Sequence, residues 1–187
     1  MSLEEILDQI YPLTNPSKKQ LMAIFEEETY PKSHILIKAQ KIEPKLYFMK
    51  KGIVRGYSEF ETGDITFWFG KEGNPILSMK SYVENKRGYE NIELLEPSTV
   101  YSADSHTLKL LFKKDIAIAN WGRILAEQEL IKTEERLISR QLRTATERYL
   151  ELISNEPDLI KRVPLNHIAS YLGITQVSLS RIRATLK

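Results

Sequence analysis

The sequence predicts an α+β fold in which an antiparallel β jelly roll is followed by a long helix and a C-terminal helix-turn-helix. Short runs of β-branched and aromatic residues fill residues 33–112, and an apolar series with helical spacing starts at Ala117. A glycine at position 173 separates two short apolar segments near the end. These patterns divide the chain into a β-roll domain over residues 1–115, a long helix expected to dimerise over 116–143 and a helix-turn-helix unit over 144–187.

The β segment contains candidate strands at residues 34–37, 46–49, 52–57, 65–69, 91–95 and 98–102. The sequence Glu61-Thr62-Gly63-Asp64 is typical of a hairpin turn between two of them. Phe67, Trp68 and Phe69, at strand spacing, are expected in the core rather than around a ligand. Many short strands at regular spacing favour an antiparallel sandwich or a jelly-roll barrel.

Residues 1–30 show helical spacing instead. Apolar side chains recur at Leu3, Ile6, Leu7 and Ile10, and again at Leu21, Ile24 and Phe25 after the start signal Pro16-Ser17. The acidic run Glu26-Glu27-Glu28 in this segment is interpreted as the solvated face of a helix. The later pair Glu134-Glu135 is interpreted in the same way.

The long helix carries apolar residues at alternating steps of four and three. The series is Ala117, Trp121, Ile124, Ile131, Ile138, Leu142, Ala145, Tyr149 and Leu152, with Gln128 and Glu135 as exceptions. A 3.5-residue repeat over several heptads is typical of a helix that packs along a partner helix. We therefore predict a homodimer whose seam contains Trp121, Ile124, Ile131, Ile138 and Leu142. The alternative is an amphipathic helix that lies on its own β domain.

The last part of the chain meets the spatial demands of a helix-turn-helix. Ala169 is small enough for two helices to cross closely, Gly173 can adopt the positive φ of a tight turn, and Thr175 can cap the second helix. The residues expected in a shared core are Ile168, Leu172, Ile174, Leu179 and Ile182. An ordinary helical corner is the alternative, but the number of matched positions favours the DNA-binding motif.

A wheel at about 100° per residue divides the second helix into two sides. The side expected to be buried contains Leu179, Ile182 and Leu186. The side expected to face DNA contains Val177, Ser180, Arg181 and Ala184. An arginine among small residues can form a bidentate contact with guanine O6 and N7.

The charge distribution supports this interpretation. The net charge is only +2, yet the stretch from residue 161 onward carries basic residues and no acidic ones. These basic residues are Lys161, Arg162, Arg181, Arg183 and Lys187. We include Arg183 and Ser180 in the predicted DNA-binding surface.

The order of β domain, long helix and terminal helix-turn-helix resembles the cyclic AMP receptor protein family, the Crp/Fnr regulators. The resemblance is sharpest in the stretch from Val163 through Arg183, and it is fainter in Tyr47–Gly52, Gly63–Phe69 and Thr146–Tyr149. The resemblance covers nearly the whole chain and implies a homodimeric transcription regulator that binds double-stranded DNA. It places Gln176, Val177 and Arg181 where the family reads bases, and Thr175 and Ser178 where the family contacts phosphate.

The chain departs from the family at the nucleotide pocket. The family uses a Gly-Glu pair for the ribose and an arginine for the cyclic phosphate, whereas this chain has Leu77-Ser78 and, near the arginine position, Tyr89-Glu90. A carboxylate at Glu90 would repel a cyclic phosphate, so we expect no conventional response to cyclic AMP. If a small-molecule effector binds, the resemblance and the neighbouring residues suggest Ser78, Arg87, Tyr89 and Thr133. The chain ends at Lys187, so we also expect no β-hairpin wing after the second helix.

The residues offer little support for catalysis or for a metal site. There are no cysteines, and the histidines at 34, 106 and 167 form no HxH or HxxxH pair. No phosphate-binding loop and no nucleophile with an adjacent base occur. We therefore expect a protein that is not an enzyme and that has no cofactor. His167 is interpreted as a surface residue, near a DNA phosphate rather than a metal.

Two other function classes stay open. One is a small-ligand binding module in which the β-roll pocket carries the main activity, and the other is a jelly-roll metalloenzyme. The acidic N-terminus lacks the pattern of a signal peptide, and no apolar stretch reaches the roughly 18 residues of a membrane span. We therefore expect a soluble cytoplasmic protein with no membrane partner.

Overall fold

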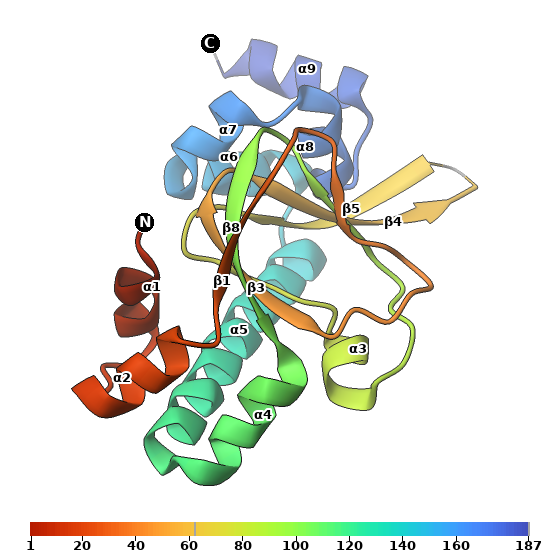
Figure 1. Ribbon diagram of the computed structural model, residues 1–187. Helices are drawn as coiled ribbons and strands as arrows, with labels where there is room; N and C mark the ends of the chain where they lie inside the picture. Colours follow the sequence, from red (N-terminus) through yellow and green to blue (C-terminus); the bar gives the residue numbers. More distant parts are fainter. Residues whose placement is uncertain (62, 187) are drawn as a thin grey trace.

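A computed structural model describes residues 1–61 and 63–186 of the chain. It contains two four-stranded antiparallel sheets, a long helix that runs from the β-roll to the C-terminal part, and a group of short helices at the C-terminal end (Figure 1). The α+β class and the β-roll architecture predicted from the sequence are confirmed. Within these ranges, no helix is both long enough and apolar enough to cross a membrane.

The two sheets form the β-roll. The strands are β1 (Glu26–Tyr30), β2 (Ile35–Ile37), β3 (Lys45–Lys51), β4 (Val54–Phe60), β5 (Gly63–Gly70), β6 (Pro75–Ile76), β7 (Asn91–Leu94) and β8 (Ser98–Asp104). One sheet has the order β1-β8-β3-β6 and the other β2-β7-β4-β5. Their shared core includes Ile37, Met49, Val54, Leu94 and Val100, each at most 1% exposed. The predicted hairpin lies between β4 and β5, and its Thr62 falls outside the described residues.

The structure corrects the prediction at Glu26–Glu28, which form strand β1 and not a helix. β1 pairs along its whole length with β8, from Glu26 opposite Ser102 to Tyr30 opposite Ser98. The Glu28 carboxylate accepts hydrogen bonds from the Lys45 ammonium at 2.8 Å and from the Ser102 hydroxyl. Pairing with a strand over 70 residues away decides this conformation, and local spacing carries no information about it.

Five helices belong to the β-roll part of the described chain. They are α1 (Leu3–Ile10), α2 (Asn15–Met22), α3 (Met79–Glu84), α4 (Ser105–Lys114) and α5 (Ile116–Leu142). α1 begins with a capping box, in which Ser2 and Glu5 satisfy each other's backbone N–H groups. Asp115 separates α4 from α5 and caps α5 by accepting hydrogen bonds from the N–H groups of Ala117 and Ile118.

The first half of α5 closes the core between α1 and the β-roll. Trp121 is 0% exposed, its indole N–H donates to the Leu7 carbonyl at 3.1 Å, and its ring packs edge-on against Phe48. The predicted role of Trp121 in a dimer seam is therefore wrong, because the side chain is fully buried within its own chain. Gln128, one of the exceptions in the sequence pattern, donates to the Ile10 carbonyl at 3.2 Å on the same side of the helix.

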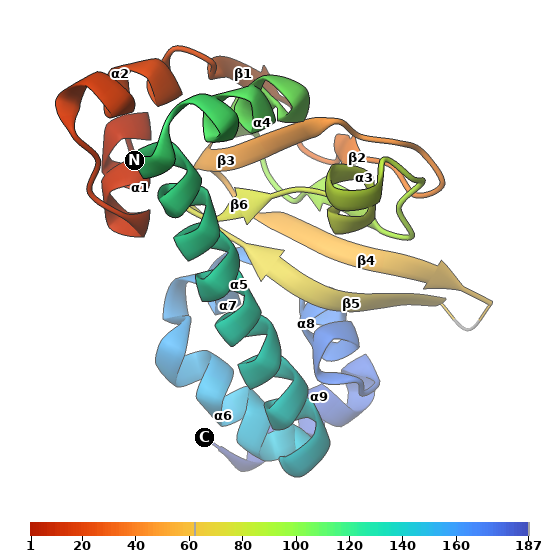
Figure 2. The ribbon, with the colours of Figure 1, turned by 90° about the horizontal axis from the view of Figure 1, so that it is seen from below.

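The C-terminal helices are α6 (Ala145–Asn155), α7 (Pro157–Arg162), α8 (Leu165–Leu172) and α9 (Gln176–Thr185). Figure 2 shows them grouped on the β4–β5 side of the β-roll, with α5 running past them. Their apolar core is continuous with the β-roll, because Ile53 and Leu95 belong to the same buried cluster as Leu152, Leu172 and Leu179. The helical unit is thus packed on the β-roll.

Arg162 connects the C-terminal helices to the β-roll through ion pairs. Its guanidinium donates to the Glu72 carboxylate at 2.9 and 3.2 Å and to the Glu96 carboxylate at 2.5 and 3.3 Å. Burial alone would raise the pKa of Glu72, but the hydrogen bonds from Arg162 and from the Gly52 N–H outweigh it and lower this pKa to about 2. A second pair, Lys71 with Glu156, lies across the same interface.

Candidate DNA-binding surface

A short turn joins α8 to α9. α8 ends at Gly173, whose φ of 69° and ψ of 32° lie in the left-handed region that favours glycine. The Ile174 N–H then donates to the Ala169 carbonyl at 3.0 Å, which closes the turn. Thr175 caps α9, because its hydroxyl accepts a hydrogen bond from the Ser178 N–H at 3.1 Å. Both the glycine turn and the threonine cap predicted from the sequence are confirmed.

The inner side of this helix pair is well packed. Ile168 and Leu172 are 1% exposed, Ala169 is 2% exposed, and Leu179 of α9 is 0% exposed. Leu186 departs from the prediction, since α9 ends at Thr185 and the Leu186 side chain is 45% exposed. The residue lies past the last helical position, so the helical wheel no longer describes its direction.

The outer side of α9 is exposed. Gln176, Val177, Ser180 and Arg181 all face solvent, and Val177 is 61% exposed. No ion pair within residues 63–186 uses Arg181. The guanidinium is therefore available to a partner.

The other predicted DNA contacts divide into three kinds. The hydroxyls of Thr175 and Ser178 lie 2.9 Å apart at the exposed N-terminus of α9, where backbone N–H groups suit a phosphate. The Ser180 hydroxyl donates to the Gln176 carbonyl at 2.9 Å and so is used within the helix. Arg183 is exposed in the last turn, and Lys187 lies outside the described residues.

Two basic or titratable residues assigned to the DNA side point to the β-roll instead. Arg162 is held by Glu72 and Glu96 and is therefore not free to bind phosphate. His167 is half-buried; burial and then the nearby Arg55 charge lower its pKa, while Asp64 opposes them. Since Arg55 and Asp64 belong to strands β4 and β5, His167 faces the sheet, which corrects its assignment as a residue near DNA phosphate.

The second half of α5 leaves large aliphatic side chains exposed. We call these residues the α5 apolar face: Leu130 (69% exposed), Ile131 (55%), Leu137 (55%), Ile138 (49%) and Leu142 (80%). Of the predicted seam residues, Ile131, Ile138 and Leu142 belong to this face and Ile124 is partly buried. Leu130 and Leu137 were not in the sequence prediction, because the 3.5-residue series that starts at Trp121 passes through Ile131 and Ile138, one position after each of them.

The four predicted ligand-pocket residues are differently placed. Ser78 is 0% exposed and its hydroxyl has no hydrogen-bond partner among the described residues, whereas Tyr89 is 63% exposed and Arg87 is also exposed. The Thr133 hydroxyl donates to the Glu129 carbonyl of its own helix at 2.7 Å. Glu90, near the position of the family's arginine, is only 5% exposed. A pocket formed by these residues stays a prediction.

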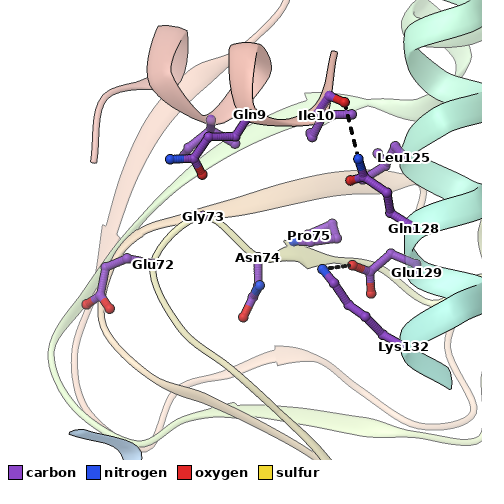
Figure 3. Close-up of a pocket in the computed structure, with 11 residues that line it drawn as sticks. Gln9, Ile10, Glu72, Gly73, Asn74, Pro75, Leu125, Gln128, Glu129 and Lys132 are labelled. Atoms are coloured by element: carbon purple, nitrogen blue, oxygen red, sulfur yellow. Dashed lines mark hydrogen bonds and ion pairs between the residues drawn. The ribbon is translucent and has the colours of Figure 1, made fainter. Parts of the chain in front are cut away.

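A cavity of about 200 Å³ lies elsewhere, between α1, the turn before β6 and α5 (Figure 3). Its polar lining consists of Gln9, Glu72, Asn74, Gln128, Glu129 and Lys132. Its charges are matched in pairs, since Lys132 contacts Glu129 at 2.6 Å and Glu72 contacts Arg162. We assign no ligand to it. Over residues 1–61 and 63–186, no cluster of three or more potential metal-ligating side chains occurs.

The chain matches no family model and no curated protein. Solved structures do resemble it. FixK2 from Bradyrhizobium japonicum is 19% identical, with 87% of this chain and 84% of that chain covered and a TM-score of 0.72. CLP, the c-di-GMP-responsive global regulator of Xanthomonas campestris, is 15% identical, with 92% and 91% covered and a TM-score of 0.72.

A third structure, described as a regulator of the Crp/Fnr family from Eubacterium rectale, is 16% identical, with 95% and 87% covered and a TM-score of 0.74. At these identities the agreement concerns the arrangement of the backbone. It extends over both the β-roll and the C-terminal helices, because each comparison covers at least 87% of this chain. The chain therefore has the fold of the Crp/Fnr regulators.

Proposed function

We propose that the chain is a sequence-specific DNA-binding transcription regulator that acts as a homodimer. The observation that carries this proposal is the outer side of α9, where an unpaired Arg181 stands among small and polar side chains on a helix anchored by the fully buried Leu179. Such a helix can enter the major groove, and Arg181, Gln176 and Val177 would contact base edges. Thr175 and Ser178 would contact phosphate at the helix N-terminus.

The homodimer is supported by the α5 apolar face. Five exposed aliphatic side chains on one helix are costly in water and suit a second copy of the same helix. Two recognition helices about 34 Å apart would then bind a two-fold symmetric DNA site, one half-site each. The resemblance to the regulators named above is in accord with this arrangement.

We further propose that cyclic AMP does not act on this chain in the usual way. Ser78 and Glu90 are buried where the family places groups for the ribose and the cyclic phosphate, and a buried carboxylate disfavours an anionic ligand. An effector of another kind stays open. One structural neighbour is described as responsive to c-di-GMP, so that nucleotide belongs in any ligand screen.

The proposal is tested by selection of bound sequences from a randomised DNA pool, followed by fluorescence anisotropy on the selected site at two salt concentrations. Wild type should enrich a two-fold symmetric site and bind it less tightly as salt rises. Arg181→Ala should weaken specific binding by about 1–3 kcal/mol and relax the sequence preference at one base pair of each half-site. Lys113→Ala, which removes an exposed positive charge from α4, is the matched control.

Two results would contradict this assignment. Equal affinity of wild type and Arg181→Ala for the selected site would mean that α9 does not read bases through this residue. Absence of any enriched sequence, in protein shown to be folded, would favour the second candidate, a ligand-binding module. A thermal-shift screen with cyclic AMP and c-di-GMP then discriminates, because a ligand at 100 times its Kd stabilises by about 2.7 kcal/mol.

A further inference from the structure

Glu134 stands at the centre of the α5 apolar face. On a helix, the neighbours of a residue on the same face are those three and four positions away. For Glu134 these are Leu130, Ile131, Leu137 and Ile138, and all four are exposed aliphatic side chains. A carboxylate therefore lies in the middle of the surface that is otherwise best suited to contact another apolar helix.

The charge of Glu134 is not compensated within the protomer. Other carboxylates of α5 have cationic partners on the same helix, such as Glu127 with Arg123 and Glu129 with Lys132, each at 2.6 Å. No ion pair or hydrogen bond of Glu134 occurs among the described residues. The carboxylate is free and exposed.

The occupant of the face that we favour is a second copy of α5. Ile124, Ile131 and Ile138 recur at seven-residue spacing, which matches a helix that packs along an identical helix. The neighbouring side of α5 is unavailable, because Trp121 and Gln128 bond to α1 of their own protomer. The α5 apolar face also continues to Leu142, the last residue of the helix, directly before the DNA-binding helices.

In a parallel two-fold pair, each residue near the axis lies next to its own copy. Two Glu134 carboxylates would then meet between eight aliphatic side chains, four from each protomer. Like charges repel, and the surrounding aliphatic groups remove the water that would screen them. A single polar residue in the core of a coiled coil is known to limit its stability in this way.

We infer that Glu134 weakens the homodimer, because repulsion between the two Glu134 carboxylates opposes self-association at the centre of the interface. The inference rests on the proposed homodimer and adds the residue that controls its strength. A weak dimer makes occupancy of a two-fold DNA site depend steeply on protein concentration, and anything that neutralises the carboxylate pair would promote binding. Glu134 thus controls the affinity of one copy of the chain for the other, and it does not contact DNA.

The experiment compares dimer dissociation constants by sedimentation equilibrium for wild type, Glu134→Leu and Glu135→Leu, with thermal unfolding to verify that each variant is folded. Glu135 carries the same charge one position away, but its same-face neighbours include Lys132 and Ser139. Glu134→Leu should lower the dissociation constant by about tenfold or more, which corresponds to 1.4 kcal/mol, and should exceed the effect of Glu135→Leu. Higher salt should tighten the wild-type dimer by screening the repulsion and should have little effect on the Glu134→Leu dimer.

A charge-reversal experiment provides an independent readout. Glu134→Lys alone should be a weak dimer, because two ammonium groups repel as two carboxylates do. Mixed with differently labelled wild type, it should form heterodimers in excess of the statistical half, since a carboxylate then faces an ammonium group.

Each outcome bears on a separate claim. Heterodimers at the statistical fraction, or a Glu134→Leu dimer no tighter than wild type, would overturn the role of Glu134 and leave the homodimer intact. A larger gain for Glu135→Leu would move the axis to the line through Ile131, Glu135, Ile138 and Leu142 and would likewise overturn the inference. Folded protein that stays monomeric in every variant would contradict the proposed homodimer itself.

Discussion

The Ser170 hydroxyl of α8 accepts a hydrogen bond from the Thr66 backbone N–H at 2.9 Å and donates one to the Asp64 carbonyl at 2.7 Å. Both backbone groups belong to β5, which is the edge strand of its sheet. One side chain of the helix-turn-helix therefore pairs with a sheet edge that would otherwise present unpaired groups. Together with Arg162, this contact connects the C-terminal helices directly to the β-roll.

We expect Ser170→Ala to destabilise the protein by about 1 kcal/mol, because the buried Thr66 N–H loses its partner. Urea unfolding measures the change in the free energy of unfolding, and hydrogen exchange should show faster exchange of the Thr66 amide. Ser154→Ala, at an exposed position of α6, is the control and should have little effect. An unchanged Thr66 exchange rate would contradict the contact.

Trp121 and Leu142 should affect different equilibria. Trp121→Ala removes a fully buried side chain and should cost about 3–5 kcal/mol of folding stability at any protein concentration. Leu142→Ala removes a side chain that is 80% exposed and should leave monomer stability nearly unchanged while weakening self-association. Unfolding at several protein concentrations separates the two effects. If the effect of Trp121→Ala depended on protein concentration and that of Leu142→Ala did not, Trp121 would belong to the dimer seam as the sequence predicted.

The pair of Arg162 and Glu72 should make stability sensitive to acid. The pKa of Glu72 is lowered in the folded state from 4.5 to about 2. The contribution of Glu72 to the free energy of unfolding is therefore complete above about pH 4.5 and is lost as the pH falls toward 2. Glu72→Gln should therefore flatten the dependence of unfolding free energy on pH in this window.

Arg162→Gln supplies the control for this pair. It removes the main hydrogen-bond donor to Glu72 and should also flatten the acid dependence, while the double variant should lose less than the sum of the single effects. Additive losses would show that the two side chains act independently, against the contact observed here.

Gly173 should be sensitive to the side chain that replaces it. At φ of 69°, Gly173→Ala should cost about 1–2 kcal/mol, even though, apart from its chain neighbours, no described residue has an atom within 4 Å of an added Cβ. Gly173→Asn should cost less, because asparagine tolerates the left-handed region better than alanine does. Equal stability of the two variants in urea unfolding would contradict strain as the cause.

The helix-turn-helix could be predicted from sequence because its signals are local. The left-handed glycine at 173, the cap at Thr175 and the buried Leu179 lie within seven consecutive residues and act on backbone groups near them. The β-roll was predictable at the level of class for the same reason, since short apolar runs separated by turns specify strands one at a time. Neither signal identifies which distant segment a residue will contact.

Apart from Leu186, which lies past the end of α9, the misplaced assignments depend on such distant contacts. Glu26–Glu28 form a strand because β8 supplies their hydrogen-bond partners. Arg162 is not available to DNA because it forms ion pairs with Glu72 and Glu96. The α5 series is the clearest case. Its spacing alone could not distinguish a side that contacts a partner from a side that contacts its own α1.

The sequence by itself thus determined the fold class, the position of the helix-turn-helix and the identity of the outward residues of α9. Only the tertiary structure decided that Trp121 and Gln128 belong to the protomer core and that Leu130, Glu134 and Leu137 lie on the free side of α5. The physical reason is that helix periodicity defines which residues share a face, whereas the free energy of burying that face depends on whatever surface the rest of the chain brings against it.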